Sequence, residues 1–148
     1  MTEPEATELT ARLQRVLARL ARLLRREAPS ALGPGALSAL STLLAEGPMR
    51  PTDLAAREGV RPPTLTRMLT SLEEGGYVER ANDPADRRAS LIAVTPLGRQ
   101  TVHDTRIARA NHLARHLAEL SPAQRRAIAA AIPALEALAD SGEARPTS

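Results

Sequence analysis

Residues 49–88 read MRPTDLAAREGVRPPTLTRMLTSLEEGGYVERANDPADRR, and the rest of the chain is organised around them. A first segment opens at Pro51, a residue suited to the first position of a helix, and stops at Gly59, which fits the left-handed residue that ends a helix. Residues 62–63, both proline, open a second segment that stops at the glycine pair 75–76. The pattern therefore predicts two short helices joined by a tight turn.

The second of these helices has one apolar side and one polar, basic side. At 100° per residue, the apolar positions fall within about 60° of Leu65 and should face the core. These positions are Leu65, Met68, Leu69 and Leu72. The outer half carries Pro63, Thr66, Arg67 and Thr70. A short, polar and basic face of this kind is what a helix needs to enter a DNA major groove.

Two runs after the glycine pair predict a β-hairpin. Residues 77–80 and 90–95 alternate or run apolar, and Met49 adds a residue or two of strand. The loop 81–89 between them reads ANDPADRRA and is rich in turn-forming residues. The whole stretch is therefore predicted to be a helix-turn-helix followed by a wing. In such a module the second helix lies in a groove of DNA and the wing reaches beside it.

The chain on either side of this module is predicted to be helical. Residues 8–28 place leucines on one face of a long helix and arginines on the other. A helix with its leucines inward covers residues 36–45, and two more cover 96–118 and 122–138. Pro133 should bend the last helix or end it early. The arginine face of the first helix is read as a solvated or partner-facing surface, with a second DNA contact as the alternative.

These elements predict one mainly α-helical domain with a small β-hairpin. The winged helix-turn-helix DNA-binding part covers residues 33–95, between dimerisation helices at 8–28 and 96–140. Flexible tails are expected at 1–7 and 141–148. The end helices have an apolar face and no other domain to bury it, so a second copy of the chain is the simplest partner. Two-fold symmetry would also match a DNA palindrome.

Composition narrows the function further. The 148 residues include one Tyr and no Phe or Trp, so the core must be aliphatic. The absence of Cys excludes disulfides and thiolate metal sites. There is no apolar run of about 18 residues and no signal-peptide pattern, so we expect a cytoplasmic protein without a membrane span. Net charge is only +3, which means that attraction to DNA must come from where the arginines lie.

The pattern resembles the MarR (multiple-antibiotic-resistance regulator) family of winged-helix repressors over roughly residues 8–140. The resemblance rests on PTDLAAREGV, on TLTRMLTSLEEGGYVER, and on the DPADRR wing followed by a strand and TPLGR. Asp86 and Arg88 match the family's acid-x-Arg wing signature. The resemblance implies a homodimer, joined by its first and last helices, that binds a pseudopalindromic operator. Many members release DNA when a small anionic or aromatic molecule binds between the dimer helices and the DNA-reading part.

One position departs from the family. The residue before the recognition helix is usually a small hydroxyl cap, and here it is Arg61. Loss of a cap can cost about 1 kcal/mol. Arg61 could instead reach a phosphate of bound DNA, which would offset that loss in the complex.

The candidate DNA-binding residues share a position on the recognition helix or in the wing. They are Arg61, Pro62, Pro63, Thr64, Thr66, Arg67, Thr70, Arg87 and Arg88, with Asp86 as wing support. Arg67 is expected to fork onto guanine, with a phosphate contact or a salt bridge as the alternative. The threonines could donate to phosphates, touch thymine methyls, or simply lie on the surface. The two prolines are expected to set the helix start and to pack on sugars or methyls.

The wing residues have separate expected roles. Arg88 should enter the minor groove, where narrow A·T-rich segments attract guanidinium, and Arg87 should contact phosphate. Asp86 should hold the wing by pairing with an arginine. The alternative for all three is a plain solvated turn.

Other classes of function find little support in the sequence. His112 and His116 are four residues apart and share a helix face, but a zinc site would need a further ligand such as Asp104 or Glu119. We expect no metal, no cofactor and no enzymatic activity, because no phosphate-binding glycine loop or nucleophile–base pair is recognisable. The role of His103, His112 and His116 stays open. Two alternatives remain: a winged-helix DNA-binding protein without ligand response, and a helical protein–protein adaptor.

Overall fold

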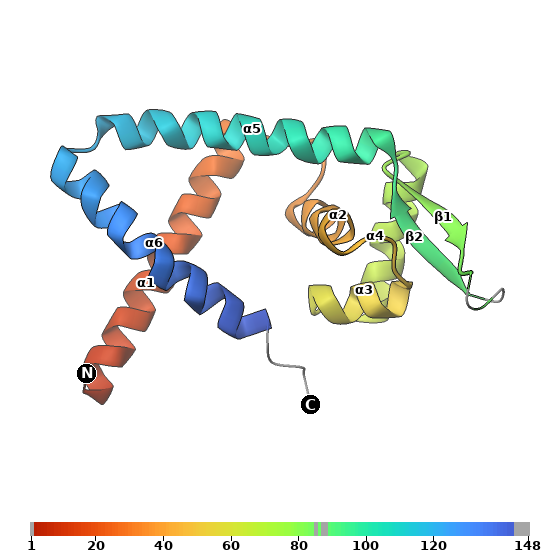
Figure 1. Cartoon of the computed structure of the whole chain (residues 1–148), viewed down its shortest axis with the longest axis horizontal. Coiled ribbons are helices and arrows are strands. Elements are labelled where there is room, and N and C mark those ends of the chain that lie inside the picture. Colours follow the sequence, from red (N-terminus) through yellow and green to blue (C-terminus); the bar gives the residue numbers. More distant parts are fainter. Residues whose placement is uncertain (1, 85, 87–88, 144–148) are drawn as a thin grey trace. The chain divides into compact units, whose positions relative to one another are not determined.

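The computed structural model describes residues 2–84, 86 and 89–143. Its contacts divide the chain into two compact units, Met1–Arg109 and Ala110–Ser148. The elements, labelled in Figure 1, are α1 (Glu3–Glu27), α2 (Pro34–Glu46), α3 (Pro51–Glu58), α4 (Pro62–Glu74), β1 (Val78–Asn82), β2 (Ser90–Val94), α5 (Pro96–Glu119) and α6 (Pro122–Glu143). The predicted order of four helices, a hairpin and two helices is confirmed.

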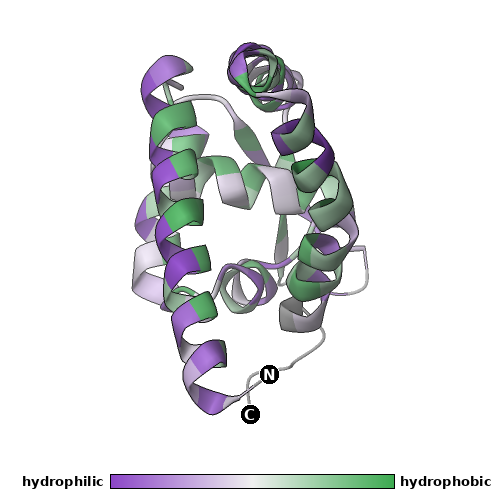
Figure 2. Ribbon diagram, turned by 90° about the vertical axis from the view of Figure 1, so that its left-hand side faces the viewer, coloured by the Kyte–Doolittle hydropathy of each residue, from purple (hydrophilic) through white to green (hydrophobic). Residues whose placement is uncertain are grey.

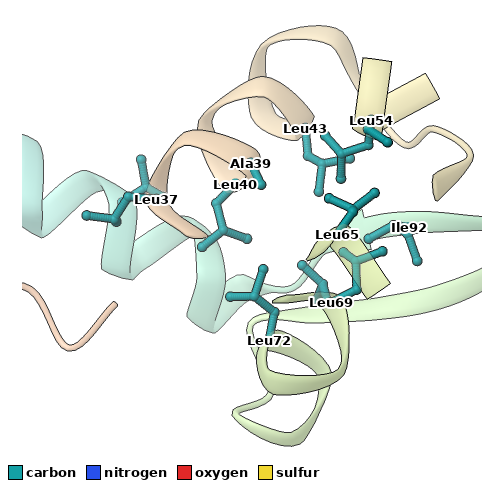
Figure 3. Packing of buried hydrophobic residues seen from close by; sticks show 12 residues of the cluster. Leu37, Ala39, Leu40, Leu43, Leu54, Leu65, Leu69, Leu72 and Ile92 are labelled. Carbon is teal, nitrogen blue, oxygen red and sulfur yellow. The ribbon is translucent and has the colours of Figure 1, made fainter. Parts of the chain in front are cut away.

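An aliphatic core lies between α2, α3, α4 and the hairpin (Figure 3). The predicted inward face of α4 is confirmed, because Leu65, Leu69 and Leu72 are each only 1% exposed. The largest fully buried side chains are Leu40, Leu54, Leu65, Leu69, Leu72 and Ile92. All buried members of this core are aliphatic, and Tyr77 packs against them as a partly buried neighbour. The helix-turn-helix therefore has a complete core within one chain.

The hairpin is antiparallel and its register runs from Val78 opposite Val94 to Asn82 opposite Ser90. Met49 adds the predicted short piece of strand. Its N–H donates to the carbonyl of Ile92 at 3.3 Å, and the N–H of Ile92 donates back at 2.8 Å. The chain entering α3 is thus hydrogen-bonded to β2.

The junction between β2 and α5 is closely packed. Thr95 donates its hydroxyl to the carbonyl of Gly76 at 2.6 Å and accepts the N–H of Gly98 at 3.1 Å. Gly98 lies against the backbone of Tyr77, and a Cβ built there would be 2.2 Å from the Tyr77 carbonyl oxygen. Only a residue without a side chain fits this close approach, which fixes where α5 leaves the hairpin.

Two predicted boundaries were wrong. Helix α1 begins at Glu3, so residues 3–7 are helical and not part of a flexible tail. The reason lies in the first turn, where the carboxylate of Glu5 accepts the N–H of Thr2 at 2.7 Å. Helix α6 neither ends at Pro133 nor stops before 141, but continues to Glu143. Pro133 removes one backbone donor without interrupting the helix.

Helix α1 leaves its apolar face open. Figure 2 shows hydrophobic residues along one side of this long helix and hydrophilic residues along the other. Leu9, Val16, Leu17 and Leu20 are 56%, 50%, 48% and 43% exposed. No residue of α1 is buried. Among the described helices, none is long and apolar enough to cross a membrane.

Candidate nucleic-acid interface

The leucines that pack in the core also set which face of α4 points outward. Because Leu65, Leu69 and Leu72 fix one side of the helix against α2 and α3, the opposite side must face solvent. The residues of this outer face are all exposed: Pro63, Thr66, Arg67 and Thr70. Arg61, Pro62 and Thr64, at the start of the helix, are exposed as well. The structure therefore brings together all seven predicted residues that belong to the recognition helix.

The start of α4 explains the unusual Arg61. This residue is the N-cap and its side chain makes no capping hydrogen bond. A capping side chain normally accepts from the second or third N–H of the helix. Here the first two positions are Pro62 and Pro63, which have no N–H, and the N–H of Thr64 already donates to the Arg61 carbonyl at 2.9 Å. A hydroxyl cap would find no open donor, so its loss costs less than the 1 kcal/mol expected above.

The hydroxyl groups of two threonines on the outer face donate hydrogen bonds to the helix backbone. Thr66 donates to the carbonyl of Pro62 at 2.9 Å, and Thr70 donates to the carbonyl of Thr66 at 3.0 Å. A hydroxyl has a single hydrogen, so neither can donate to a phosphate while these bonds hold. Each hydroxyl oxygen can still accept, and each side chain keeps a methyl group. Of the three sequence-based alternatives, this geometry argues against donation to phosphate, and contact with a thymine methyl or a plain surface position remains.

Arg67 lies between these threonines on the exposed face. Among the described residues, no acid lies within ion-pair distance of its guanidinium. A salt bridge within this part of the chain therefore does not occupy it, and its five N–H donors can face a ligand. Guanine offers two acceptors in the major groove that match this fork.

The wing is fastened to the helix-turn-helix by two ion pairs that the sequence did not reveal. Arg80 on β1 reaches Glu73 at the end of α4, with Nε and Oε1 2.7 Å apart. Arg50, just before α3, donates from Nε and Nη2 to Oδ2 of Asp83 at 2.9 and 2.6 Å. The carboxylate of Asp83 raises the pKa of Arg50 through these hydrogen bonds and through its charge.

The predicted wing residues are only partly described. Arg87 and Arg88 lie outside the described residues, and their roles stay predictions. Asp86 is exposed, and its Oδ2 lies 3.9 Å from Nη2 of Arg50. The acid that binds Arg50 most closely is Asp83. The first Asp of the DPAD run was the signal in the sequence, but its arginine partner is 33 residues away.

The histidines do not gather into a site. A side-chain contact joins His112 to Arg115, and Nδ1 of His116 lies 3.7 Å from Oε2 of Glu119. In the part of the chain that the structure describes, no three His, Cys, Asp or Glu side chains are arranged to hold a metal.

A three-helix core, a two-stranded wing and an exposed basic helix define a winged helix-turn-helix DNA-binding module. Comparisons with known proteins agree. A family model described as MarR family matches residues 32–90. An HTH-type transcriptional regulator of Mycobacterium tuberculosis is 41% identical over 133 residues, which cover 89% of this chain and 93% of the relative. The chain belongs to the MarR family, whose members are transcriptional regulators that bind DNA.

Solved structures support the fold over nearly the whole chain. A protein described as a transcriptional regulator from Pseudomonas aeruginosa has a TM-score of 0.80 at 32% identity, and covers 94% of this chain and 98% of that protein. BpsR of Bordetella bronchiseptica has a TM-score of 0.63 at 23% identity, and covers 86% of this chain and 91% of BpsR. The BpsR structure concerns regulation of its DNA binding by 6-hydroxynicotinic acid.

Proposed function

We propose that this chain is a homodimeric repressor that binds a pseudopalindromic operator in double-stranded DNA. Each copy would place the outer face of α4 in a major groove and its wing in the adjoining minor groove. The observation that carries the proposal is the two-sided character of α4, whose leucines are 1% exposed while Pro63, Thr66, Arg67 and Thr70 are all exposed. Because its partner is DNA, we place the protein in the cytoplasm.

The leucines of α1 support the proposed dimer. Leu17 and Leu20 are 48% and 43% exposed, and each Å² of apolar surface removed from water stabilises by about 25 cal/mol. A second copy offers the same face, and a two-fold axis lets both bury it at once. The two α4 helices would then meet two half-sites on one side of the duplex, about 34–36 Å apart.

Each candidate DNA-binding residue has a proposed task. Arg67 forks onto guanine, and the methyl groups of Thr66 and Thr70 read thymine. Arg61 and Thr64, at the start of the helix, contact phosphates. Pro62 and Pro63 pack on sugars or methyls. Arg87 and Arg88 keep the phosphate and minor-groove roles that their sequence suggests.

The test begins with a selection of random duplexes by the wild-type protein. Titration of the selected duplex and its single-base variants then compares wild type with Arg67→Ala. We expect specific binding to weaken by about 1–3 kcal/mol and one position in each half-site to lose its base preference. Arg57→Ala is the matched control, because Arg57 is an exposed arginine of α3 that pairs with Glu46 at 2.9 Å. An unchanged base preference in Arg67→Ala would exclude Arg67 as a base reader.

A small-molecule response is the second candidate function, and one pocket favours it. An open pocket of about 420 Å³ lies between α1, α2 and α5 and is lined by Arg25, Ser38, Ser41 and Arg109 among others. Arg25 and Arg109 both line this pocket, and their guanidinium groups would attract and pair with an anion. We therefore propose a small carboxylic acid as effector.

Matched ligands test this proposal. We expect benzoate or 6-hydroxynicotinic acid to release the selected duplex and the neutral benzamide to leave it bound. Arg109→Gln should remove the response to the acids while DNA affinity without them stays as in wild type. Release by benzamide at the same concentration, or an unchanged response in Arg109→Gln, would exclude this pocket as an anion site.

A further inference from the structure

Asp83 has an unusual environment for a charged residue. It directly follows β1 and is 7% exposed, and it is the only charged residue in the described part of the chain that is buried. A buried carboxylate is strongly unfavourable unless it is paired and hydrogen-bonded. Its position at this point of the wing therefore needs a partner.

Arg50 is one such partner. Its Nε and Nη2 both donate to one oxygen of Asp83, at 2.9 and 2.6 Å. Asp86 lies further away, with its Oδ2 3.9 Å from Nη2 of Arg50. The guanidinium is planar and holds its two donors in a fixed geometry, so the pair fixes a direction as well as a distance.

The pair joins the base of the wing to the start of α3. The N–H of Asp83 donates to the carbonyl of Ala89 at 3.2 Å and closes the loop at its base. Met49, the neighbour of Arg50, is hydrogen-bonded to Ile92 on β2. Adjacent residues therefore hold both strands, Met49 by its backbone and Arg50 by its side chain.

The hairpin also has contacts that do not involve the side chain of Arg50. Its two strands pair along their full length, Met49 is bridged to β2, and Arg80 holds β1 to Glu73 of α4. What Arg50 adds is a fixed position for the outer end of the hairpin, just beyond Asn82. Arg87 and Arg88 follow a few residues later in the sequence and lie outside the described residues.

We infer that Arg50 is a positioning residue for DNA recognition: through Asp83 it fixes the outer end of the hairpin relative to α3, whose core packing against α4 carries this position to the recognition helix, without itself reading a base. The inference rests on the proposed function. It predicts two separable parts of specificity. Positions read by α4 depend on Arg67, whereas positions flanking them, read by the wing, depend on the Arg50–Asp83 pair.

The experiment compares wild type, Arg50→Gln, Asp83→Asn and Arg57→Gln by selection from a random duplex library and by titration. Arg57→Gln is the matched control, since it makes the same change in an exposed ion pair of α3 that does not touch the wing. We expect wild type and Arg57→Gln to lose about tenfold in affinity when the selected flanks are replaced. Arg50→Gln and Asp83→Asn should bind both duplexes alike, yet keep the wild-type preference at the α4 positions.

The swap Arg50→Asp with Asp83→Arg separates positioning from folding. It restores opposite charges, and it should recover at least part of the flank preference that either single change removes. Thermal unfolding of each variant shows whether the fold is retained. If Arg50→Gln and Asp83→Asn keep the flank preference, or lose it together with the preference at the α4 positions, the inference is wrong. A wild-type protein that selects no sequence at all would overturn the proposed function and this inference with it.

Discussion

Helices α1 and α4 are both amphipathic and both use leucine for their apolar face, yet they end in opposite states. The leucines of α4 are 1% exposed, whereas Leu9, Leu17 and Leu20 of α1 are 43–56% exposed. The difference does not come from residue type or from helical period. It comes from what each helix meets, because α4 packs against α2 and α3 within the same unit.

The comparison distinguishes a part of the chain that buries its own apolar face from a part that does not. The helix-turn-helix is finished within one chain, so its polar face is held in place before any ligand arrives. Helix α1 has an apolar face of the kind that folded proteins cover with a partner. The preorganised helix-turn-helix and the exposed apolar face of α1 together explain why a regulator of this family would act as a dimer.

The largest effect is expected where a charge is placed on the open face. Leu20→Asp would bury two charges in a two-fold dimer, each at a cost of several kcal/mol, and should give monomers in sedimentation equilibrium. Ala18→Asp is the matched control, because at 100° per residue Ala18 lies on the exposed side away from the leucines. If Leu20→Asp sediments like wild type, α1 does not join the two copies through this face.

The complete core should respond differently. Leu65→Ala removes a side chain that is 1% exposed and leaves a cavity, so the free energy of unfolding should fall by about 2–5 kcal/mol. Urea denaturation at a fixed protein concentration measures this loss. Ser71→Ala, an exposed change on the same helix, should stay within about 0.5 kcal/mol of wild type. Equal effects from the two changes would contradict the idea that one side of α4 is the core.

A substitution at the junction between β2 and α5 should lower the stability of the fold by a smaller amount. Gly98→Ala would place a Cβ 2.2 Å from the Tyr77 carbonyl oxygen and 2.8 Å from Cγ1 of Val94, and we expect a loss of about 1–3 kcal/mol. Thermal unfolding tests this. Gly35→Ala, in α2, meets only the flexible end of Met68 at 3.1 Å. That variant should be neutral or slightly stabilised, since Ala suits a helix better than Gly.

Much of the module could be predicted because local signals agreed. Proline starts, glycine stops and the spacing of leucines located α3 and α4 and identified the inner face of α4. The small cost of the missing hydroxyl cap at Arg61 was also within reach, since two prolines at the helix start leave few donors to cap. The Arg50–Asp83 pair was out of reach. An ion pair between residues 33 positions apart leaves no periodic trace in a sequence.

The first turns of α1 and α4 supply the finest comparison. At α4 two prolines remove the backbone donors that a cap would bind. At α1 the carboxylate of Glu5 accepts the backbone N–H of Thr2. This hydrogen bond, and to a smaller extent one from the Thr2 hydroxyl, lowers the pKa of Glu5 below its ordinary value of 4.5. A carboxyl whose pKa is lower in the folded chain stabilises the folded state above its unfolded pKa, and this stabilisation is lost as pH falls through the folded pKa.

We therefore expect the first turn of α1 to fray in acid. Amide hydrogen exchange of its first residues, measured against pH, tests this. Glu5→Gln should remove this pH dependence and Glu3→Gln should keep it. A pH profile that is the same in all three proteins would mean that the Glu5 carboxylate does not stabilise the start of α1.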